Sequence, residues 1–401
     1  MSCRPLKKFR ILDLTNVLSG PFCCHLLAHL GADIVKVEVP GSGDLARQLG
    51  ADPDLSKKKM GVSFLAQNAG KKSLTLNLKS VEGKSIFKKL VETADVLVEN
   101  FRPGVMDRLG LGFEVLKQIN CSLIYCAISG FGSTGDLRDK PAYDQIIQGM
   151  SGVMSITGDC DSAPLRVGYP VADSIGGLSA ALAVTSLLAG RNGELKEAAF
   201  VDVSMLAATM STMGWVVSNY LIAGKEPQPM GNDNFTASPS GTFRTEEGLI
   251  NIAANKQEQF EALCRVVGLE QLIEDERFYD RLARLENREV LKQLLEKALS
   301  GRSAREWEKD FSAASIPAGL VLTVPEALNN RQWDSNEMIG RFSDLPDIGD
   351  IAIFRPGFRV NGRPLEVADP PPKLGEHTEQ ILGELGFSHD DIQNLHSKGV
   401  I

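Results

Sequence analysis

The stretch ILDLTNVLSGPFCCHLLAHLGADIVKVEVPGSGD, residues 11–44, carries the clearest structural pattern in the chain. Its runs at 11–14 and 33–39 are rich in aliphatic residues and typical of strands, and apolar residues at helical spacing occur over 21–31 between them. The alternation continues with strand patterns at 73–78, 96–100 and 123–129 and helical patterns at 82–93 and 113–119. Strands that alternate with helices predict βαβ units, and therefore an α/β fold with a mostly parallel sheet and helices on its faces.

The second half of the chain predicts a different organisation. Two long apolar helical patterns, near 174–189 and 203–224, complete the first part, and Asp173-Ser174 is placed to cap the first of them. The segment Lys225–Ser240 is rich in Pro, Asn and Ser and predicts a linker. Beyond it we expect strands at 241–244, 249–253 and 351–354, and helices at 257–267, 288–298, 303–313, 376–386 and 389–397. We therefore divide the chain into a large Rossmann-like domain at 1–225, a smaller α+β domain at 226–330, and a segment at 331–401 that returns to the large domain.

Charge and composition exclude several classes of partner. The 401 residues carry a formal net charge of −8, so the surface lacks the basic character that nucleic acids or anionic lipids require. The two uncharged helical patterns are diluted with Ser, Thr, Gly and Asn, which favours core helices over membrane spans. The seven cysteines form no CxxC pair, and the first 17 residues lead directly into a strand without a signal-peptide pattern. We expect a cytoplasmic protein.

Two familiar motifs do not fit their usual chemistry here. Gly130–Gly135 reads GFGSTG, but the polar segment and Pro141 that follow predict a loop, whereas a dinucleotide site needs a helix there. His25 and His29 are four residues apart, but they lack the Glu of a zinc-binding HExxH motif and lie in an apolar helix. We expect no metal site.

Basic residues recur in the loops that we expect after the strands. A cluster at the carboxyl ends of parallel strands would suit a polyphosphate ligand through charge-assisted hydrogen bonds. The basic residues of these loops are Lys71, Lys72, Arg102, Arg108, Arg138 and Lys140.

The segment GYPVADSIGG, residues 168–177, places Asp173 at the start of an apolar helix with two glycines close behind. One interpretation is ordinary helix capping. The other is a nucleophilic carboxylate, held ionised by the helix N-terminus and exposed by its small neighbours, that attacks an activated acyl group. Nearby backbone amides would then stabilise the developing oxyanion.

Taken together, these blocks resemble the family III CoA-transferases (CaiB/BaiF family), which include formyl-CoA, carnitine and glutarate CoA-transferases and related 2-methylacyl-CoA racemases. The resemblance covers nearly the whole chain in order. Besides 11–44, it rests on 68–112, LIYCAISGFGSTG (123–135), PAYDQIIQGMSGVMSITG (141–158), VADSIGG (171–177) and PKLGEHTEQIL (372–382). It implies a Rossmann-like domain plus a small domain, a homodimer of interlocked subunits, and coenzyme A as a substrate with no permanently bound cofactor.

The resemblance also implies roles for single residues. Asp173 falls at the catalytic aspartate, which forms an acyl anhydride and then a thioester with CoA. Arg108 and the Asn100-Phe101 turn would lie near the CoA, Lys71 and Lys72 near its phosphate or adenine end, and Tyr143 and Asp144 near the thioester. The implied reaction moves CoA from a donor such as succinyl-CoA to a small, dicarboxylic acid. Independently of the resemblance, we hypothesise that Arg47, just after the GSGD turn, or Arg166 pairs with the distal carboxylate of such an acid.

Two alternatives remain at this point, an acyl-CoA racemase or isomerase and a non-catalytic acyl-CoA-binding protein. The racemases use a His where this chain has Tyr143, and a phenol with a reference pKa near 10 is a poor general base at pH 7. The oxalate enzymes carry a glycine run where this chain has Gly231–Ser238 (GNDNFTAS), which argues against oxalate specialisation. Many relatives also have a His in place of Asn234 and a basic residue in place of Val39.

Overall fold

The computed structural model describes residues 4–191 and 197–401. The chain divides into two compact units, the first made of Met1–Val153, Arg166–Lys225 and Arg331–Ile401, and the second of Met154–Leu165 and Glu226–Asn330. The division expected from the sequence differs from this one at residues 154–165, which we expected in the first domain. In the structure the Gly231 amide donates to the Gly158 carbonyl at 2.7 Å, which joins this short segment to the second unit.

Six parallel strands form the sheet of the first unit, in the order β3-β2-β1-β4-β5-β6. Their bounds are Lys71–Thr75, Asp33–Glu38, Arg10–Asp13, Val96–Glu99, Ile124–Ser129 and Ala199–Ser204 respectively. The central strand β1 pairs Ile11 with Ile34 of β2 and with Val96 of β4. The predicted α/β class with a parallel sheet is confirmed. Because the strand order reverses between β1 and β4, the loops after these two strands diverge and leave a crevice at their carboxyl ends.

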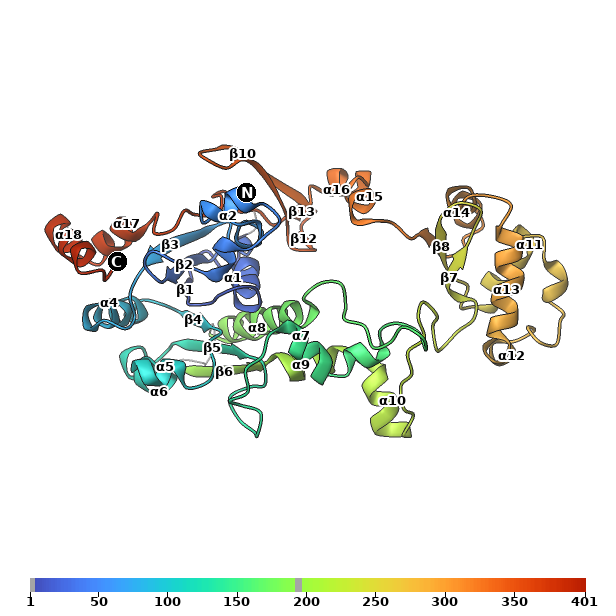
Figure 1. Cartoon of the computed structure of the whole chain (residues 1–401), viewed down its shortest axis with the longest axis horizontal. Helices are drawn as coiled ribbons and strands as arrows, with labels where there is room; N and C mark the ends of the chain where they lie inside the picture. Colours follow the sequence, from blue (N-terminus) through green and yellow to red (C-terminus); the bar gives the residue numbers. More distant parts are fainter. Residues whose placement is uncertain (1–3, 192–196) are drawn as a thin grey trace. The chain divides into compact units, whose positions relative to one another are not determined.

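Helices cover both faces of this sheet (Figure 1). Alternating side chains of the strands contribute to two cores, one on each face. Ile11 and its equivalents pack against α1 (Ser19–His29) and α8 (Val171–Gly190). Leu12 and its equivalents pack on the other face. The helices of that second face are α4 (Val81–Glu92), α6 (Phe113–Ile119), α17 (Thr378–Glu384) and α18 (His389–Ser397). The period of two along each strand therefore places helices on both faces.

The segment at 331–401 joins the first unit at the outer edge of the sheet, where the His377 amide donates to the Ser73 carbonyl of β3 at 3.0 Å. It also forms two antiparallel pairs of strands, and of these four strands the sequence predicted only the one at Gly349–Phe354. Its elements before α17 are α16 (Arg331–Asn336), β10 (Ile339–Leu345), β11 (Gly349–Phe354), β12 (Arg359–Val360) and β13 (Arg363–Pro364).

The helix expected at 203–224 is wrong in two respects. Residues Ala199–Ser204 form β6, and the rest divides into α9 (Met205–Thr212) and α10 (Trp215–Ala223), separated by Gly214 at φ +53°. In contrast, α8 is continuous, and among the described residues it is the one helix long and apolar enough to cross a membrane. It packs with its Ala- and Gly-rich face on α1.

The remaining short elements of the first unit lie in its connecting loops, and η2, which follows α7 in the sequence, has its last three residues in the second unit. They are η1 (Leu45–Gln48), α2 (Pro53–Lys57), α3 (Val62–Leu65), α5 (Val105–Leu109), α7 (Asp144–Met150) and η2 (Val153–Ile156).

The second unit is an antiparallel sheet of three strands covered by helices (Figure 1). Its core is aromatic and aliphatic, with Phe243, Phe260 and Phe311 among the buried side chains. The strands are β7 (Ser240–Arg244), β8 (Leu249–Ala253) and β9 (Ala318–Leu320). The helices are α11 (Gln257–Val266), η3 (Glu270–Leu272), α12 (Arg281–Glu286), α13 (Arg288–Leu299), α14 (Ala304–Ala313) and α15 (Val324–Leu328).

Candidate active site

A groove of about 300 Å³ opens at the carboxyl ends of β1 and β4, at the reversal of strand order. We call it the carboxyl-end groove. Its walls are the loop after β1 (16–19), the loop after β4 (100–103), the segment 138–143 and Asp173 of α8. All of these residues belong to the first unit.

The loop after β1 is held in a strained conformation. Val17 has φ +68°, which is rare for a β-branched residue. The Asn100 side chain accepts a hydrogen bond from the Asn16 amide and donates to the Asn16 carbonyl, both at 2.8 Å, and Asp44 accepts from the Val17 amide at 2.9 Å. Asn100 therefore shapes the groove by joining its two principal loops. Such over-determined strain is characteristic of functional loops.

Asp173 is the third residue of α8 and lies half-buried in the groove. Burial raises the pKa of Asp173 to about 7, the carboxylate of Asp144 adds to the rise, and a hydrogen bond with Ser19 opposes it. The expected capping role is wrong, and the pKa of Asp173 shifts in the direction opposite to that expected of a carboxylate stabilised by a helix N-terminus. The helix begins at Val171, and its first amides are occupied by Asp144, whose Oδ1 accepts from Ala172 at 2.8 Å and from Asp173 at 3.4 Å.

The two glycines behind Asp173 allow close packing. A Cβ on Gly177 would lie 2.4 Å from the Ser19 carbonyl oxygen, and one on Gly176 would lie 2.9 Å from Cγ of Met205. These approaches bring α8 against the start of α1, so Ser19 reaches the Asp173 carboxyl. Ser19 carries no sequence signal for this contact.

The basic end of the groove contains Arg102, Arg138 and Lys140, all exposed. Arg108 of α5 does not line the groove, but its guanidinium and that of Arg138 both border the space beside Gly104. Phe101 lies next to them, and its amide donates to Glu99 at 2.7 Å. Three cations against the single carboxyl of Asp173 make this end suitable for an anion.

Lys71 and Lys72 do not belong to this cluster. Both begin β3 instead of following a strand, so the expectation that they lie in a carboxyl-end loop is wrong. Lys71 is buried and its ammonium contacts Asp13 at 2.9 Å, while Lys72 pairs with Asp33 at 2.8 Å. Although burial opposes it, the ammonium groups of Lys36 and Lys71 lower the pKa of Asp13 to about 2. Both lysines are therefore paired with carboxylates of the first unit.

Arg47 is also occupied. Its guanidinium contacts both carboxylate oxygens of Glu38 at 2.7 Å, stacks on Phe64 and is fully buried. It cannot serve as a partner for the far end of a substrate. Arg166 differs, because its side chain is 45% exposed and lies 3.8 Å from Asp144.

Tyr143 projects into the groove and is 72% exposed, whereas Asp144 beside it is buried. No histidine lines the described groove. His25 and His29 are buried in α1, where burial lowers the pKa of His29 to about 4 and that of His25 well below its usual value. No group of three metal-ligating side chains occurs among residues 4–191 and 197–401.

A second cavity of about 250 Å³ adjoins the groove and shares Phe101 and Arg138 with it. Glu99 lies at its buried end. Burial raises the pKa of Glu99 to about 7 against the hydrogen bonds of Phe101 and Tyr125, and the carboxylates of Asp107 and Asp202 contribute to the rise. The sequence analysis missed Glu99, although a charged residue that ends a buried strand is a usable signal.

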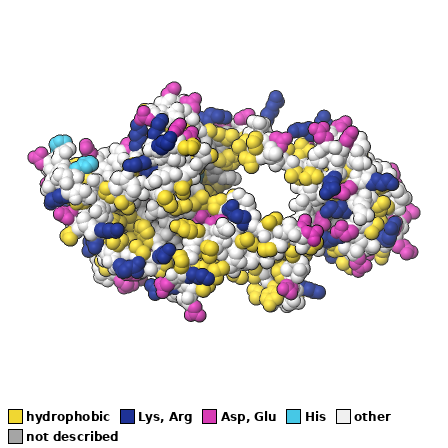
Figure 2. Space-filling model, viewed as in Figure 1, with side chains coloured by type: hydrophobic (Ala, Val, Ile, Leu, Met, Phe, Trp, Pro, Cys, Tyr) yellow, Lys and Arg dark blue, Asp and Glu magenta, His cyan; other side chains and the backbone are white. Residues whose placement is uncertain are grey.

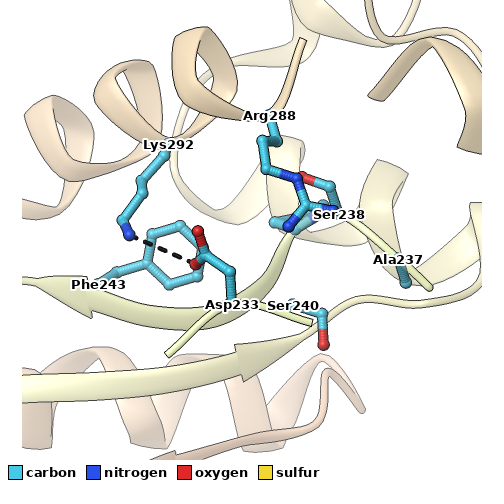
Figure 3. A pocket seen from close by; sticks show the side chains of 8 residues that line it. Asp233, Ala237, Ser238, Ser240, Phe243, Arg288 and Lys292 are labelled. Carbon is cyan, nitrogen blue, oxygen red and sulfur yellow. Dashed lines mark hydrogen bonds and ion pairs between the residues drawn. The ribbon is translucent and has the colours of Figure 1, made fainter. Parts of the chain in front are cut away.

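The second unit has a pocket of its own, between α13 and the segment 233–243 (Figure 3). Arg288 and Lys292 project from the same helix, and Lys292 pairs with Asp233 at 3.3 Å. The cavity measures about 10 Å³, room for about one water molecule. Asn234 accepts from the Thr236 amide at 2.8 Å, so in this unit it stabilises a turn.

Comparison with known proteins agrees with this geometry. Residues 6–378 match the model of CoA-transferase family III. The chain is 35% identical over 401 residues to succinyl-CoA:glutarate CoA-transferase of Mus musculus, covering 100% of this chain and 91% of that protein. It is 40% identical over 336 residues to acetyl-CoA:oxalate CoA-transferase of Acetobacter aceti, covering 84% and 85%. A crystal structure of a CaiB/BaiF family protein from Brucella suis superimposes with a TM-score of 0.82 at 33% identity, covering 95% and 99%.

Proposed function

Because the chain belongs to the family III CoA-transferases, we propose that it moves CoA from an acyl-CoA donor such as succinyl-CoA to a small dicarboxylic acid, with Asp173 as the nucleophile. The observation that carries the proposal is that Asp173 lines the same groove as Arg102, Arg138 and Lys140. The groove offers a carboxylate for the thioester and three cations for the phosphates of CoA. The relatives named for glutarate and for oxalate both act on dicarboxylates.

The first half of the reaction needs only the carboxylate. An oxygen of ionised Asp173 attacks the thioester carbonyl, the C–S bond breaks, and the CoA thiolate leaves an acyl-aspartyl anhydride. The thiolate then attacks the Asp173 carbonyl carbon and expels the donor acid as its carboxylate, which leaves an aspartyl-CoA thioester. No net proton is taken up or released. A carboxylate with a pKa of about 7 is a stronger nucleophile than one with an ordinary pKa.

The second half reverses these steps with the acceptor. Its carboxylate attacks the aspartyl thioester and releases the thiolate, which then attacks the acceptor carbonyl of the new anhydride. This forms the new acyl-CoA and restores Asp173.

The contacts with CoA are part of the proposal. We assign the phosphates to Arg138 and Lys140, with Arg108 and the Asn100-Phe101 turn at the adjoining wall. Tyr143 and Asp144 lie at the thioester end. Lys71 and Lys72 are withdrawn from this set because both hold carboxylates of the fold.

Arg166 is our candidate for the distal carboxylate of the acceptor. It is half-exposed and its guanidinium lies on the Asp144 side of the α8 N-terminus. Replacing it by Glu should weaken the use of dicarboxylates while the use of monocarboxylates is unchanged. Loss of both in equal measure would contradict this assignment.

The experiment that tests the proposed function is peptide mass spectrometry after incubation with succinyl-CoA and a hydroxylamine quench. Hydroxylamine converts an aspartyl anhydride or thioester into a hydroxamate. We expect this modification on Asp173 alone, absent from Asp173→Ala and present in the matched control Asp139→Ala, whose carboxylate is exposed beside the groove. Exchange of an α-proton into deuterated water without labelling would favour a racemase, and tight CoA binding with neither signal would favour a binding protein.

We further propose a homodimer, with the interlocking that the family resemblance implies. Hydrophobic side chains gather over α10 (Figure 2), where no residue is buried and Ile222 is 86% exposed. Leu221 of α10 is exposed as well, and an apolar surface of this kind usually meets a partner. Light scattering should give twice the chain mass, and Leu221→Glu with Ile222→Glu should reduce it to that of one chain.

Cytoplasmic location is also part of the proposal. The six cysteines among the described residues are all free, as in a reducing compartment. Cell fractionation with a detectable tag tests it, and recovery in a membrane fraction would contradict both this location and the expected lack of a membrane partner.

A further inference from the structure

Gln148 lies outside the groove yet contacts the residues that hold Asp173. It belongs to α7, is 0% exposed and does not line the groove. Its Nε2 donates to Oδ2 of Asp144 at 2.7 Å and to the Tyr169 carbonyl at 3.3 Å. Its Oε1 accepts from the Val167 amide at 2.8 Å. One buried amide therefore joins α7 to the segment that leads into α8.

Asp144 transmits this contact to α8. Pro170 stands at the N-cap of α8 and provides no capping side chain, so the first amides of the helix depend on Asp144. Oδ1 of Asp144 accepts from Ala172 and Asp173, while Oδ2 accepts from Gln148. The two oxygens of one carboxylate thus have separate partners, and rotation of the carboxylate would break both sets of hydrogen bonds.

Two charged side chains of the described residues lie close to Asp144. Arg166 faces Oδ2 at 3.8 Å, and Asp173, whose amide donates to Oδ1 at 3.4 Å, lies beside it in the first turn of α8. On the far side of Asp173, Ser19 at the start of α1 donates to its carboxyl. The neutral amide of Gln148 is the shortest side-chain contact of Asp144.

We propose that Gln148 is a positioning residue for Asp173: its amide orients the Asp144 carboxylate, which fixes the first turn of α8 and with it the nucleophile. The inference rests on the proposed function, because it gives Gln148 a role in a reaction carried by Asp173. Gln148 touches no substrate. It acts by holding the reacting carboxyl in a productive place, where displacement by about 1 Å is costly.

The informative variant is Gln148→Glu, which keeps the size and the acceptor for the Val167 amide but removes the donor to Asp144. The new carboxylate then faces the Asp144 carboxylate, and the negative charge that it adds disfavours ionisation of Asp173. We expect kcat at pH 7 to fall about tenfold or more, with the KM for acyl-CoA nearly unchanged. The rise of kcat/KM with pH should move upward by about one pH unit.

The matched control is Asn120→Asp, another amide that joins loops, with Nδ2 donating to the Val91 and Ala94 carbonyls far from the groove. It should lower Tm and leave the pH profile in place. A second variant, Asp144→Asn, removes the negative charge and should move the pH profile downward, which covers the case in which Gln148→Glu does not fold.

The outcomes separate the two proposals. If the wild-type protein shows no label on Asp173, the proposed function fails. If the wild-type protein is labelled but folded Gln148→Glu retains its kcat and pH profile, only the positioning role fails. A lower Tm with an unchanged pH profile would also overturn it, because a merely structural residue behaves in that way.

Discussion

Replacing Asp173 by Asn should stabilise the protein at alkaline pH while it abolishes activity. Burial raises the pKa of Asp173 to about 7, and the unfolded chain has an ordinary pKa near 3.8. Between these values the folded state holds a proton that the unfolded state has lost, so stability falls as the pH rises. Below pH 4 the penalty is absent, and above pH 7 it is complete. An uncharged Asn avoids it at every pH.

The size of the effect follows from the shift. A pKa that is higher by about three in the folded state lowers the free energy of unfolding by about 4 kcal/mol, since each pH unit is worth about 1.4 kcal/mol. Water reaches the groove and screens part of this cost, so we expect about 2 kcal/mol at pH 8. The gain should increase between pH 4 and pH 7 and stay level above pH 8. Any effect of the new amide that does not depend on pH shifts the stability difference equally at every pH and leaves its slope against pH unchanged.

Calorimetric unfolding of both proteins from pH 5 to pH 8 measures this slope. The control is Asp33→Asn in the same unit. Although burial opposes it, Lys72 and Arg10 lower the pKa of Asp33, so its carboxylate is ionised in both states over this range. The control difference should therefore be independent of pH. A Tm difference for Asp173→Asn that stays constant from pH 5 to pH 8, or that falls with pH, would refute the reasoning.

Three further predictions concern the surroundings of the groove. Arg47→Ala should destabilise the protein by about 3–5 kcal/mol, because it leaves the Glu38 carboxylate buried without its partner. Urea unfolding measures this loss, and a variant as stable as the wild-type protein would contradict the role of the buried pair. Arg138→Ala and Lys140→Ala should each raise the KM for acyl-CoA about tenfold and weaken the salt dependence of that KM. Steady-state kinetics at two ionic strengths measure both quantities, and an unchanged KM would contradict the prediction. Glu99→Gln should raise Tm at pH 8 and not at pH 4, because burial raises the pKa of Glu99 to about 7. Melting curves that shift by the same amount at both pH values would contradict this prediction.

The sheet was the most predictable part of the fold. The runs at 11–14, 33–39 and 123–129 match β1, β2 and β5 closely, because aliphatic residues dominate these buried strands even where Asp13, Lys36 and Glu38 interrupt them. The strand β6 escaped because it lies at the edge of the sheet, where alternate residues of AFVDVS are exposed and Asp202 interrupts the apolar run. The break between α9 and α10 depends on Gly214, whose positive φ a hydropathy pattern does not register.

For the site, the order of motifs along the chain was sufficient to identify the family, to single out Asp173, and to place Arg138, Lys140, Asn100 and Tyr143 near it. Residue types and their spacing determine what the chain can do chemically, and they are visible in one dimension. They do not show which charges face each other. Lys71 and Arg47 read as free cations in the sequence, and only tertiary packing places them on Asp13 and Glu38.

The protonation of Asp173 was likewise decided by tertiary structure. Its position near a helix N-terminus suggested an ionised carboxylate, but Asp144, 29 residues earlier, occupies the amides that would have stabilised the charge. Gln148 and Ser19 complete this arrangement from two other segments of the chain. A pKa depends on burial and on charges within a few ångströms, and these are properties of the folded chain that a linear pattern does not contain.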